Sequence, residues 1–220
     1  MVILRPTRKL RSSLPTAAVS ACSDTALGDW YVNRIVVDRQ PLLLLVSSAS
    51  LLPLLVPARD VRALPDRLSA LVESRLRRSD VEPQVIAREL QAMHPIAVER
   101  TVDRSVLGIM VDFAKAIPYY LEAGCWAGEA LAVVEERLAE TPCHAGLSDD
   151  RVVFPNHKAP DLLRSKWLVT SRCSPRFQPN PRADYCTGQT NLARTLVVGL
   201  ARFGFSRVAA VSWNELCLRS

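Results

Sequence analysis

The fold is decided between residues 30 and 56, which read WYVNRIVVDRQPLLLLVSSASLLPLLV. Residues 30–37 are rich in aromatic and β-branched side chains, which suit the pleated surface of a strand. Residues 42–46 form a continuous apolar run, and residues 51–56 form a third run. The polar residues that separate the first two runs are typical of a hairpin connection. We therefore predict an antiparallel meander whose middle strand is buried on both faces.

Helical and strand patterns flank this meander on both sides. Apolar residues at helical spacing predict helices over residues 64–76, from Pro83, from an N-cap at Ser105, and over 127–140. Short apolar or alternating runs predict two more strands, at 2–4 and at 96–100. The sequence therefore predicts an α+β fold, with a small, mainly antiparallel sheet covered by helices.

Charge is unevenly distributed along the 220 residues of the chain. Residues 1–147 carry 17 basic and 17 acidic side chains, so the whole net charge of +6 lies within residues 148–220. The second segment is also interrupted by prolines, and its hydrophobic periodicity is weak. We predict an α+β domain over residues 1–147 and a basic, poorly ordered extension over residues 148–220. A frameshifted or unselected tail would explain the change in pattern.

Cysteine usage and the apolar segments indicate a cytoplasmic protein. The six cysteines never form a Cys-x-x-Cys pair, and reduced thiols are the expected state. Residues 19–22 resemble a lipoprotein cleavage box, but the stretch before them is charged and broken by proline, unlike an export signal. Residues 42–56 are too short and too interrupted to cross a bilayer. We expect no membrane association.

The sequence indicates neither a metal nor a cofactor. Cys143, His144 and His157 lack the paired spacing of zinc ligands. A nucleophile elbow, a phosphate-binding loop and a dinucleotide fingerprint are all missing from the sequence. We therefore expect no bound metal ion and no cofactor.

Two dense blocks mark the predicted domain, LGDWY at residues 27–31 and DRSVLG at residues 103–108. They resemble the LGDWY-like and RSVLG-like motifs of a bacterial domain family of unknown function. The resemblance covers about residues 1–147. Val111 stands where the pattern of that family has an asparagine before Asp112. The family has no assigned reaction, so the resemblance implies a fold and leaves the function open.

Polar residues within the second block and the helix after it are candidates for catalysis. Asp103 and Asp112 could supply carboxylates for acid–base chemistry, and Arg104 could hold an anion at the start of the helix. The alternative is structural. In that interpretation Asp103 and Ser105 cap the helix, and the arginines pair with aspartates to brace the sheet against it.

Polar and aromatic residues around the first block are candidates for binding. They are Asp29, Trp30, Tyr31 and Arg34. The two aromatic rings could stack on a base or a sugar. The alternative is that both rings pack within the sheet, because such residues favour half-buried strand positions.

Three functions follow from these alternatives. The leading hypothesis is a cytosolic, non-catalytic domain that binds a protein partner. The second is an enzyme that acts on nucleic acid or a nucleotide through Asp103, Arg104 and Asp112. The third is nucleic-acid binding by the basic tail. An enzyme should gather its three side chains around one cleft, whereas a binding domain should use them as caps and ion pairs.

Overall fold

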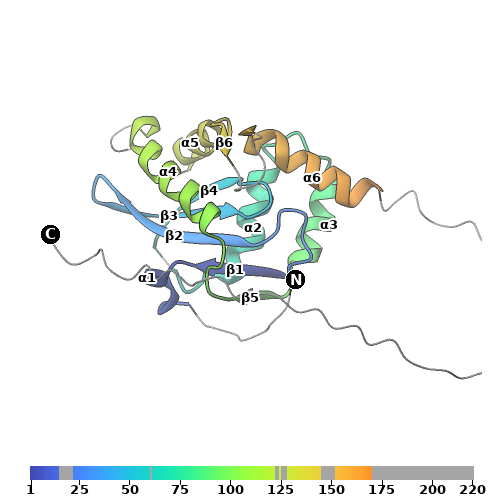
Figure 1. Ribbon diagram of the computed structural model, residues 1–220, viewed down its shortest axis with the longest axis horizontal. Helices are drawn as coiled ribbons and strands as arrows, with labels where there is room; N and C mark the ends of the chain where they lie inside the picture. Colours follow the sequence, from blue (N-terminus) through green and yellow to red (C-terminus); the bar gives the residue numbers. More distant parts are fainter. Residues whose placement is uncertain (15–21, 60, 122–123, 125–127, 145–151, 170–220) are drawn as a thin grey trace, which may run out of the picture. The chain divides into compact units, whose positions relative to one another are not determined.

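The computed structural model describes residues 1–14, 22–59, 61–121, 124, 128–144 and 152–169. Along the chain the elements are β1 (Val2–Pro6), α1 (Arg8–Arg11), β2 (Trp30–Val37), β3 (Gln40–Ser47), β4 (Pro53–Pro57), α2 (Leu64–Leu76), α3 (Pro83–Met93), β5 (Ile96–Val98), α4 (Arg104–Tyr120), α5 (Glu129–Ala139), β6 (Cys143–His144), β7 (Val152–Val153) and α6 (Pro155–Val169) (Figure 1). The predicted α+β fold is confirmed. The predicted basic extension lies outside the described residues from residue 170 onward.

The central sheet has five strands in the order β4-β3-β2-β1-β5. Strands β2, β3 and β4 form the predicted antiparallel meander. Strand β1 is parallel to both of its neighbours, and its Leu4 pairs with Trp30 of β2 and with Val98 of β5. The sheet is therefore mixed, since the N-terminal strand joins the meander to a strand that comes more than 90 residues later.

A two-residue turn connects β2 to β3. Asp38 and Arg39 both have positive φ angles, of 44° and 67°. Two consecutive positive φ values are those of a type I′ turn, whose twist matches that of the two strands it joins. The turn sets the register in which Val37 lies opposite Gln40 and Trp30 opposite Ser47.

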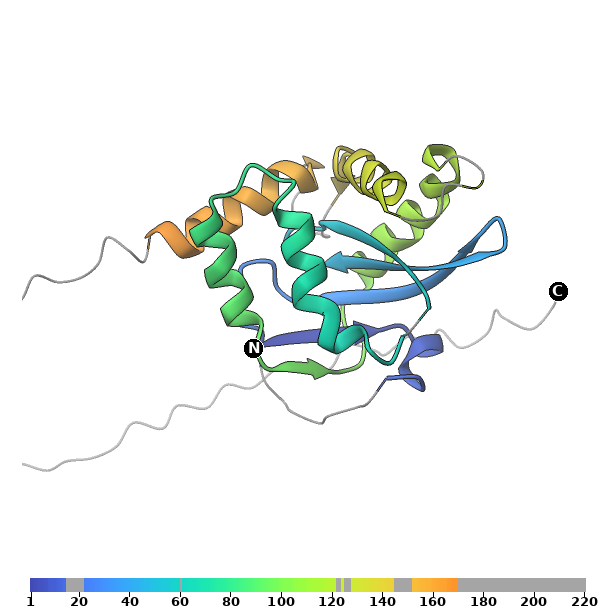
Figure 2. The same cartoon turned by 180° about the vertical axis from the view of Figure 1, so that it is seen from behind.

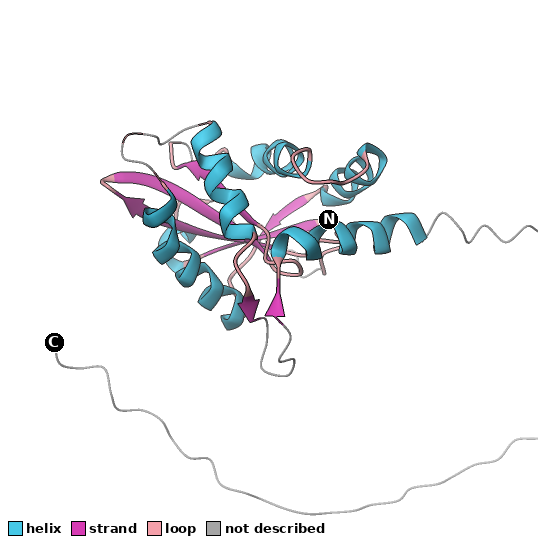
Figure 3. Ribbon diagram, turned by 90° about the horizontal axis from the view of Figure 1, so that it is seen from above, coloured by secondary structure: helices cyan, strands magenta, loops and turns pink. Residues whose placement is uncertain are grey.

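Helices cover both faces of the sheet, and each face carries its own apolar core (Figures 2 and 3). Strand β3 contributes to both cores, because Leu43 and Leu45 pack with α2 and α3 whereas Leu42 and Leu44 pack with α4 and α5. All four leucines are almost completely buried. Each contributes about 1.5–3 kcal/mol through the apolar surface that it removes from water. The predicted burial of this strand on both faces is confirmed.

Helix α6 lies beyond Leu147, where the sequence predicted the domain to end. It packs beside α3 (Figure 2), and its Ala159 and Leu163 are buried in the core on that face of the sheet. The sequence did not predict this helix, because Pro155 and Pro160 interrupt the pattern. Pro155 occupies the first helical position, where its missing N–H costs nothing. Part of the predicted extension is therefore ordered helix.

A buried carboxylate connects α3 to α6 and to the first sequence block. Glu89 is almost completely buried, and it accepts hydrogen bonds from the backbone N–H groups of Ala26 and Leu27, at 2.8 and 3.0 Å. It also accepts one from Nε1 of Trp167 on α6, at 2.7 Å. Glu89 thereby pairs two buried backbone N–H groups and also binds the part-buried indole of Trp167.

Glycine is required at position 28 of the first block. Gly28 has a φ of 73°, and a Cβ atom added there would lie 2.4 Å from Oγ of Ser48. The same hydroxyl accepts a hydrogen bond from the backbone N–H of Asp29. The block therefore turns tightly against the end of β3 before it enters β2. Among the described residues, no helix is both long and apolar enough to cross a lipid bilayer.

We expect the substitution Glu89→Ala to lower the free energy of unfolding by roughly 3 kcal/mol, because it leaves two buried backbone N–H donors without an acceptor and removes the bond to the Trp167 indole. Urea unfolding followed by circular dichroism measures this loss. The control is Gln91→Ala, an exposed position on the same helix, which should change stability by less than about 0.5 kcal/mol. Equal stability of the two variants would contradict the role given to Glu89.

Candidate functional site

The two sequence blocks meet in the structure through hydrogen bonds. The hydroxyl of Tyr31 accepts a hydrogen bond from the backbone N–H of Asp103, at 3.0 Å. Arg5, at the end of β1, donates from Nε to the carboxylate of Asp29 and from Nη1 to the carbonyl oxygen of Arg100, the latter at 2.7 Å. The blocks therefore connect the start of β2 to the segment that leads into α4.

The binding candidates of the first block occupy different environments. Trp30 is buried in the core on the α2 and α3 face, and Tyr31 is buried on the opposite face. Neither ring is therefore exposed for stacking on a ligand. Asp29 forms an ion pair with Arg5, whereas Arg34 is exposed on β2.

The catalytic candidates lie along α4 in separate roles. Asp103 is the N-cap of the helix, and its carboxylate accepts hydrogen bonds from the N–H and the hydroxyl of Ser105, both at 2.8 Å. The N-cap is therefore Asp103, as the structural alternative predicted, and the predicted N-cap at Ser105 is wrong. Arg104 is exposed. Asp112 is 71% exposed and forms an ion pair with Lys115 at 3.7 Å, about 13 Å further along the helix axis than Asp103.

If Asp103 acts as a cap, Asp103→Ala should lower the free energy of unfolding by about 1 kcal/mol, since one backbone N–H of the first turn loses its acceptor. Asp103→Asn should restore most of the loss, because asparagine is an equally good N-cap. Thermal unfolding of both variants measures the difference. A loss of the same size in both would show that the charge of Asp103, and not its capping bond, matters.

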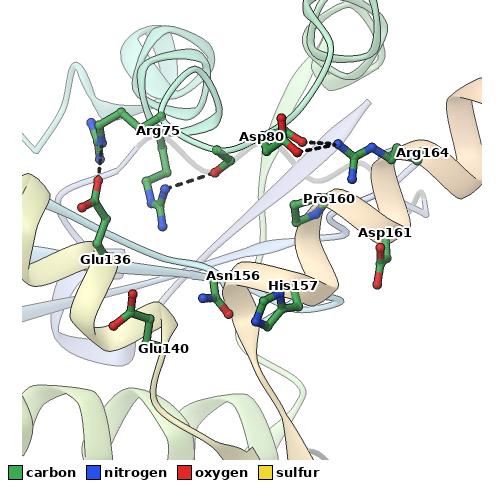
Figure 4. A pocket seen from close by; sticks show the side chains of 11 residues that line it. Arg75, Asp80, Glu136, Glu140, Asn156, His157, Pro160, Asp161 and Arg164 are labelled. Carbon is green, nitrogen blue, oxygen red and sulfur yellow. Dashed lines mark hydrogen bonds and ion pairs between the residues drawn. The ribbon is translucent and has the colours of Figure 1, made fainter.

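A groove of about 510 Å³ lies between α2, α5 and α6 (Figure 4). It is lined mainly by charged and polar side chains: Arg75, Arg78, Ser79, Asp80, Glu136, Glu140, Asn156, His157, Pro160, Asp161 and Arg164. These residues come from the C-terminal end of α2 and the segment after it, from the C-terminal end of α5, and from α6. The three helices therefore converge on one polar cavity.

Two arginines that line this groove pair with a buried carboxylate, Glu135, which lines a neighbouring cavity. Glu135 on α5 accepts a hydrogen bond from the backbone N–H of Leu55, at 2.6 Å, on the edge strand β4. Nη2 of Arg78 donates to the same carboxylate, and Nε of Arg75 lies 3.8 Å from it. Nη1 of Arg75 donates to the hydroxyl of Ser79, at 3.2 Å. Two helices are thereby attached to the edge of the sheet.

Burial shifts the pKa values of this cluster in the directions that disfavour charge. It raises the pKa of the Glu135 carboxyl, although the Leu55 N–H and the two guanidinium groups act in the opposite direction. Burial also lowers the pKa of Arg75, against the attraction of Glu135. Each charge is therefore tolerated in the interior because the others are present.

The rim of the groove carries polar groups without partners. Nε of Arg164 donates to Glu82, and its Nη2 lies 3.6 Å from the carboxylate of Asp80, so this arginine is engaged. Among the described residues, the carboxylates of Glu140 and Asp161 form no hydrogen bond and no ion pair. The groove therefore presents two unpaired carboxylates, whereas its arginines are already engaged.

A family model described as a domain of unknown function, DUF6933, matches residues 3–158 of the chain. The chain belongs to this family. The predicted membership of a family of unknown function is confirmed. The matched residues include both sequence blocks and the first turn of α6. No curated protein matches this sequence.

The metal-ligand candidates of this DUF6933 domain do not converge. Cys143 is buried, and its pKa is raised to about 11, first by desolvation and then by the charge of Asp112. A thiol with such a pKa is almost fully protonated at neutral pH, so it is a poor nucleophile. In the part of the chain that the structure describes, no three His, Cys, Asp or Glu side chains gather as metal ligands.

The groove of the DUF6933 domain was not identified from its sequence. Arg75 and Arg78 lie on α2 and Glu135 lies on α5, and no local pattern connects them. One signal was available, because Glu135 follows the apolar positions Leu131 and Val134 on the buried face of α5. A carboxylate in such a stripe indicates a buried partner.

The substitution Glu135→Ala should lower the free energy of unfolding by about 3–5 kcal/mol, because it leaves Arg75 buried without a counter-charge and the Leu55 N–H without an acceptor. Glu136→Ala is the matched control. Glu136 is exposed on the next position of α5 and lies 3.6 Å from Nε of Arg78, so its removal should cost less than about 1 kcal/mol. Chemical denaturation of both variants decides; similar losses would refute a special role for Glu135.

Proposed function

We propose that this domain is a non-catalytic module that binds a protein partner, and that its binding surface is the groove between α2, α5 and α6 together with the adjoining end of α5. The observation that carries the proposal is the continuity of this surface. A second cavity, of about 520 Å³, is lined by Tyr120, Arg137, Glu140, Thr141 and Pro142. Glu140 lines both cavities, so they are adjacent.

The composition of this surface supports a protein partner. The guanidinium of Arg137 lies over the ring of Tyr120, 5.8 Å from its centroid. Phe154 is 42% exposed at the start of α6, and its ring contacts that of His157, which lines the groove. Arginine and exposed aromatic rings are the residues enriched at protein interfaces.

The roles of the catalytic candidates also favour binding over catalysis. Asp103 caps a helix, and Asp112 pairs with Lys115 on the solvent side of α4. These are the roles expected if the polar residues are structural. The enzyme alternative needs Asp103, Arg104 and Asp112 around one cleft, and their spacing along α4 gives it less support. Nucleic-acid binding by the basic tail stays a prediction, because most of that segment lies outside the described residues.

A cytoplasmic location forms part of the proposal. Cys22 is an exposed free thiol, and Cys143 is a buried one. Reduced cysteines are typical of the reducing cytoplasm. Peptide mapping after thiol alkylation of the protein from its native cells would show whether both thiols stay reduced.

The proposal is tested with the full-length chain, purified from its native cells and quantified together with the proteins that accompany it. Phe154→Ser removes an exposed ring beside the groove and should lower recovery of the partner at least tenfold, as expected for an aromatic hot spot. Leu168→Ser is the matched control, since Leu168 is 43% exposed on the same helix and lies outside the groove. The proposal is wrong if no protein accompanies the wild type stoichiometrically, or if all three chains recover it equally.

A further inference from the structure

Strands β1, β2 and β4 all run in one direction. Strand β1 is parallel to β2, and β3 is antiparallel to both β2 and β4. The carboxyl ends of the three strands therefore point to one end of the sheet, and the segments that follow them lie there, at the right of Figure 2. Neighbouring strands lie about 4.8 Å apart, so the distance from β1 across the sheet to β4 is about 14 Å.

The segments at this end are rich in basic residues. They are residues 7–14 after β1, residues 33–41 around the end of β2, and residues 58–63 after β4, and we call these three segments the cationic end. Together they hold seven basic and two acidic side chains, a net charge of +5. Residues 1–147 carry no net charge, so the remainder of that segment carries −5. Charge is therefore separated within the domain although its total is zero.

The basic side chains of the cationic end are available to a ligand. All seven are exposed, and among the described residues none of them forms a hydrogen bond or an ion pair through its side chain. The arginines of the groove differ, because they already face carboxylates. The seven residues are Arg8, Lys9, Arg11, Arg34, Arg39, Arg59 and Arg62.

Hydrogen bonds hold the first two segments of the cationic end together. Thr7 donates from its backbone N–H to the carbonyl oxygen of Val32, at 2.9 Å, and from its hydroxyl to Oδ1 of Asn33, at 3.1 Å. Arg8 directly follows Thr7, and Arg34 directly follows Asn33. The cations of α1 and of β2 therefore belong to one surface.

The third segment is attached to the same end of the sheet. The backbone N–H of Ala58 donates to the carbonyl oxygen of Pro41, at 3.0 Å, so Arg59 leaves β4 beside the start of β3. Leu10 of α1 is buried in the apolar core against which Val61 also packs. The scaffold therefore fixes all three segments relative to one another.

The chemistry of the cationic end favours phosphate as its ligand and a nucleic acid as the source. Six of the seven cations are arginines, whose planar head group matches phosphate through two parallel hydrogen bonds. A lipid surface fits less well, because Leu10 is buried and Val36 is the only exposed large apolar side chain among the described residues of the cationic end. The three segments contain no aromatic residue, so they offer no ring on which unpaired bases could stack.

We propose that the cationic end binds the phosphate backbone of double-stranded nucleic acid without reading its sequence. Each strand of a duplex carries one phosphate per 3.4 Å of axis, so the roughly 14 Å between β1 and β4 spans about four phosphates. The cationic end precedes the N-terminus of α2, whereas the groove lies at the C-terminal end of that helix. The inference is therefore independent of the proposed function.

The test is fluorescence anisotropy of a labelled twenty-base-pair DNA duplex titrated with the purified full-length chain. Four phosphate contacts predict a slope of about −3.6, or steeper, for the logarithm of the binding constant against that of the salt concentration. Between 50 and 200 mM NaCl the affinity should therefore fall by about a hundredfold or more. An RNA duplex of the same sequence should bind within threefold of the DNA duplex, because both present the same phosphates.

The double variant Arg34→Gln/Arg59→Gln should weaken DNA binding at least tenfold at 100 mM NaCl and make the slope shallower by about two. Both side chains are exposed and unpaired, so the variant should unfold at the temperature of the wild type. The matched control is Arg77→Gln/Lys115→Gln, which removes the same charge at two exposed positions outside the cationic end. The control should bind DNA within twofold of the wild type.

Equal weakening in the two double variants would overturn the inference, since it would show attraction by net charge alone. Undetectable binding of the duplex would also overturn it. So would unchanged binding by Arg34→Gln/Arg59→Gln, which would assign DNA binding to residues outside the cationic end, including the basic tail. Tighter binding of single-stranded DNA would refute the duplex as ligand. Displacement of the duplex by phosphatidylserine vesicles or by polyglutamate at equal charge concentration would refute the nucleic acid.

Discussion

The architecture depends on one buried carboxylate that completes the edge of the sheet. Strand β4 is an outer strand, so the N–H of Leu55 has no neighbouring strand to bond with. Glu135 accepts from that N–H, and Arg78 and Arg75 on α2 offset its charge. A bond that another strand would have made is thereby replaced by one from a helix. The same arrangement protects the edge from pairing with a second chain.

The groove exists because of this attachment. Helices α2 and α5 are both held at the β4 edge, and α6 closes the space between their ends. On α3, Glu89 plays a comparable part, since it satisfies the amides of the first sequence block and the indole of Trp167. The internal charges are thus used in holding helices to the sheet. The side chains at the rim of the groove are positioned by these helices but are not needed to hold them to the sheet. They are therefore available for recognition.

Local patterns were sufficient for much of this fold. The apolar runs predicted the meander, and helical spacing placed α2 within its observed bounds, because both signals arise from neighbouring residues. The parallel pairing of β1 with β5 was not predictable, since no local pattern specifies a partner more than 90 residues away. The groove was not predicted for the same reason, because Glu135, Arg75 and Asn156 come close to one another only in the folded chain. The capping role of Asp103 was predicted as one of two alternatives, because a polar residue directly before a helical pattern is a local signal.

The position of β1 has a consequence for folding during synthesis. Strand β1 leaves the ribosome before β2 and can pair with it soon afterwards, but its other edge needs β5. At about 5–20 residues per second, the roughly 60 residues between β2 and β5 take about 3–12 s to translate. During that interval the nascent chain exposes an apolar strand edge that only later residues can cover. Chaperone engagement is therefore expected to concentrate on this window of translation and to end once Val98 has left the exit tunnel.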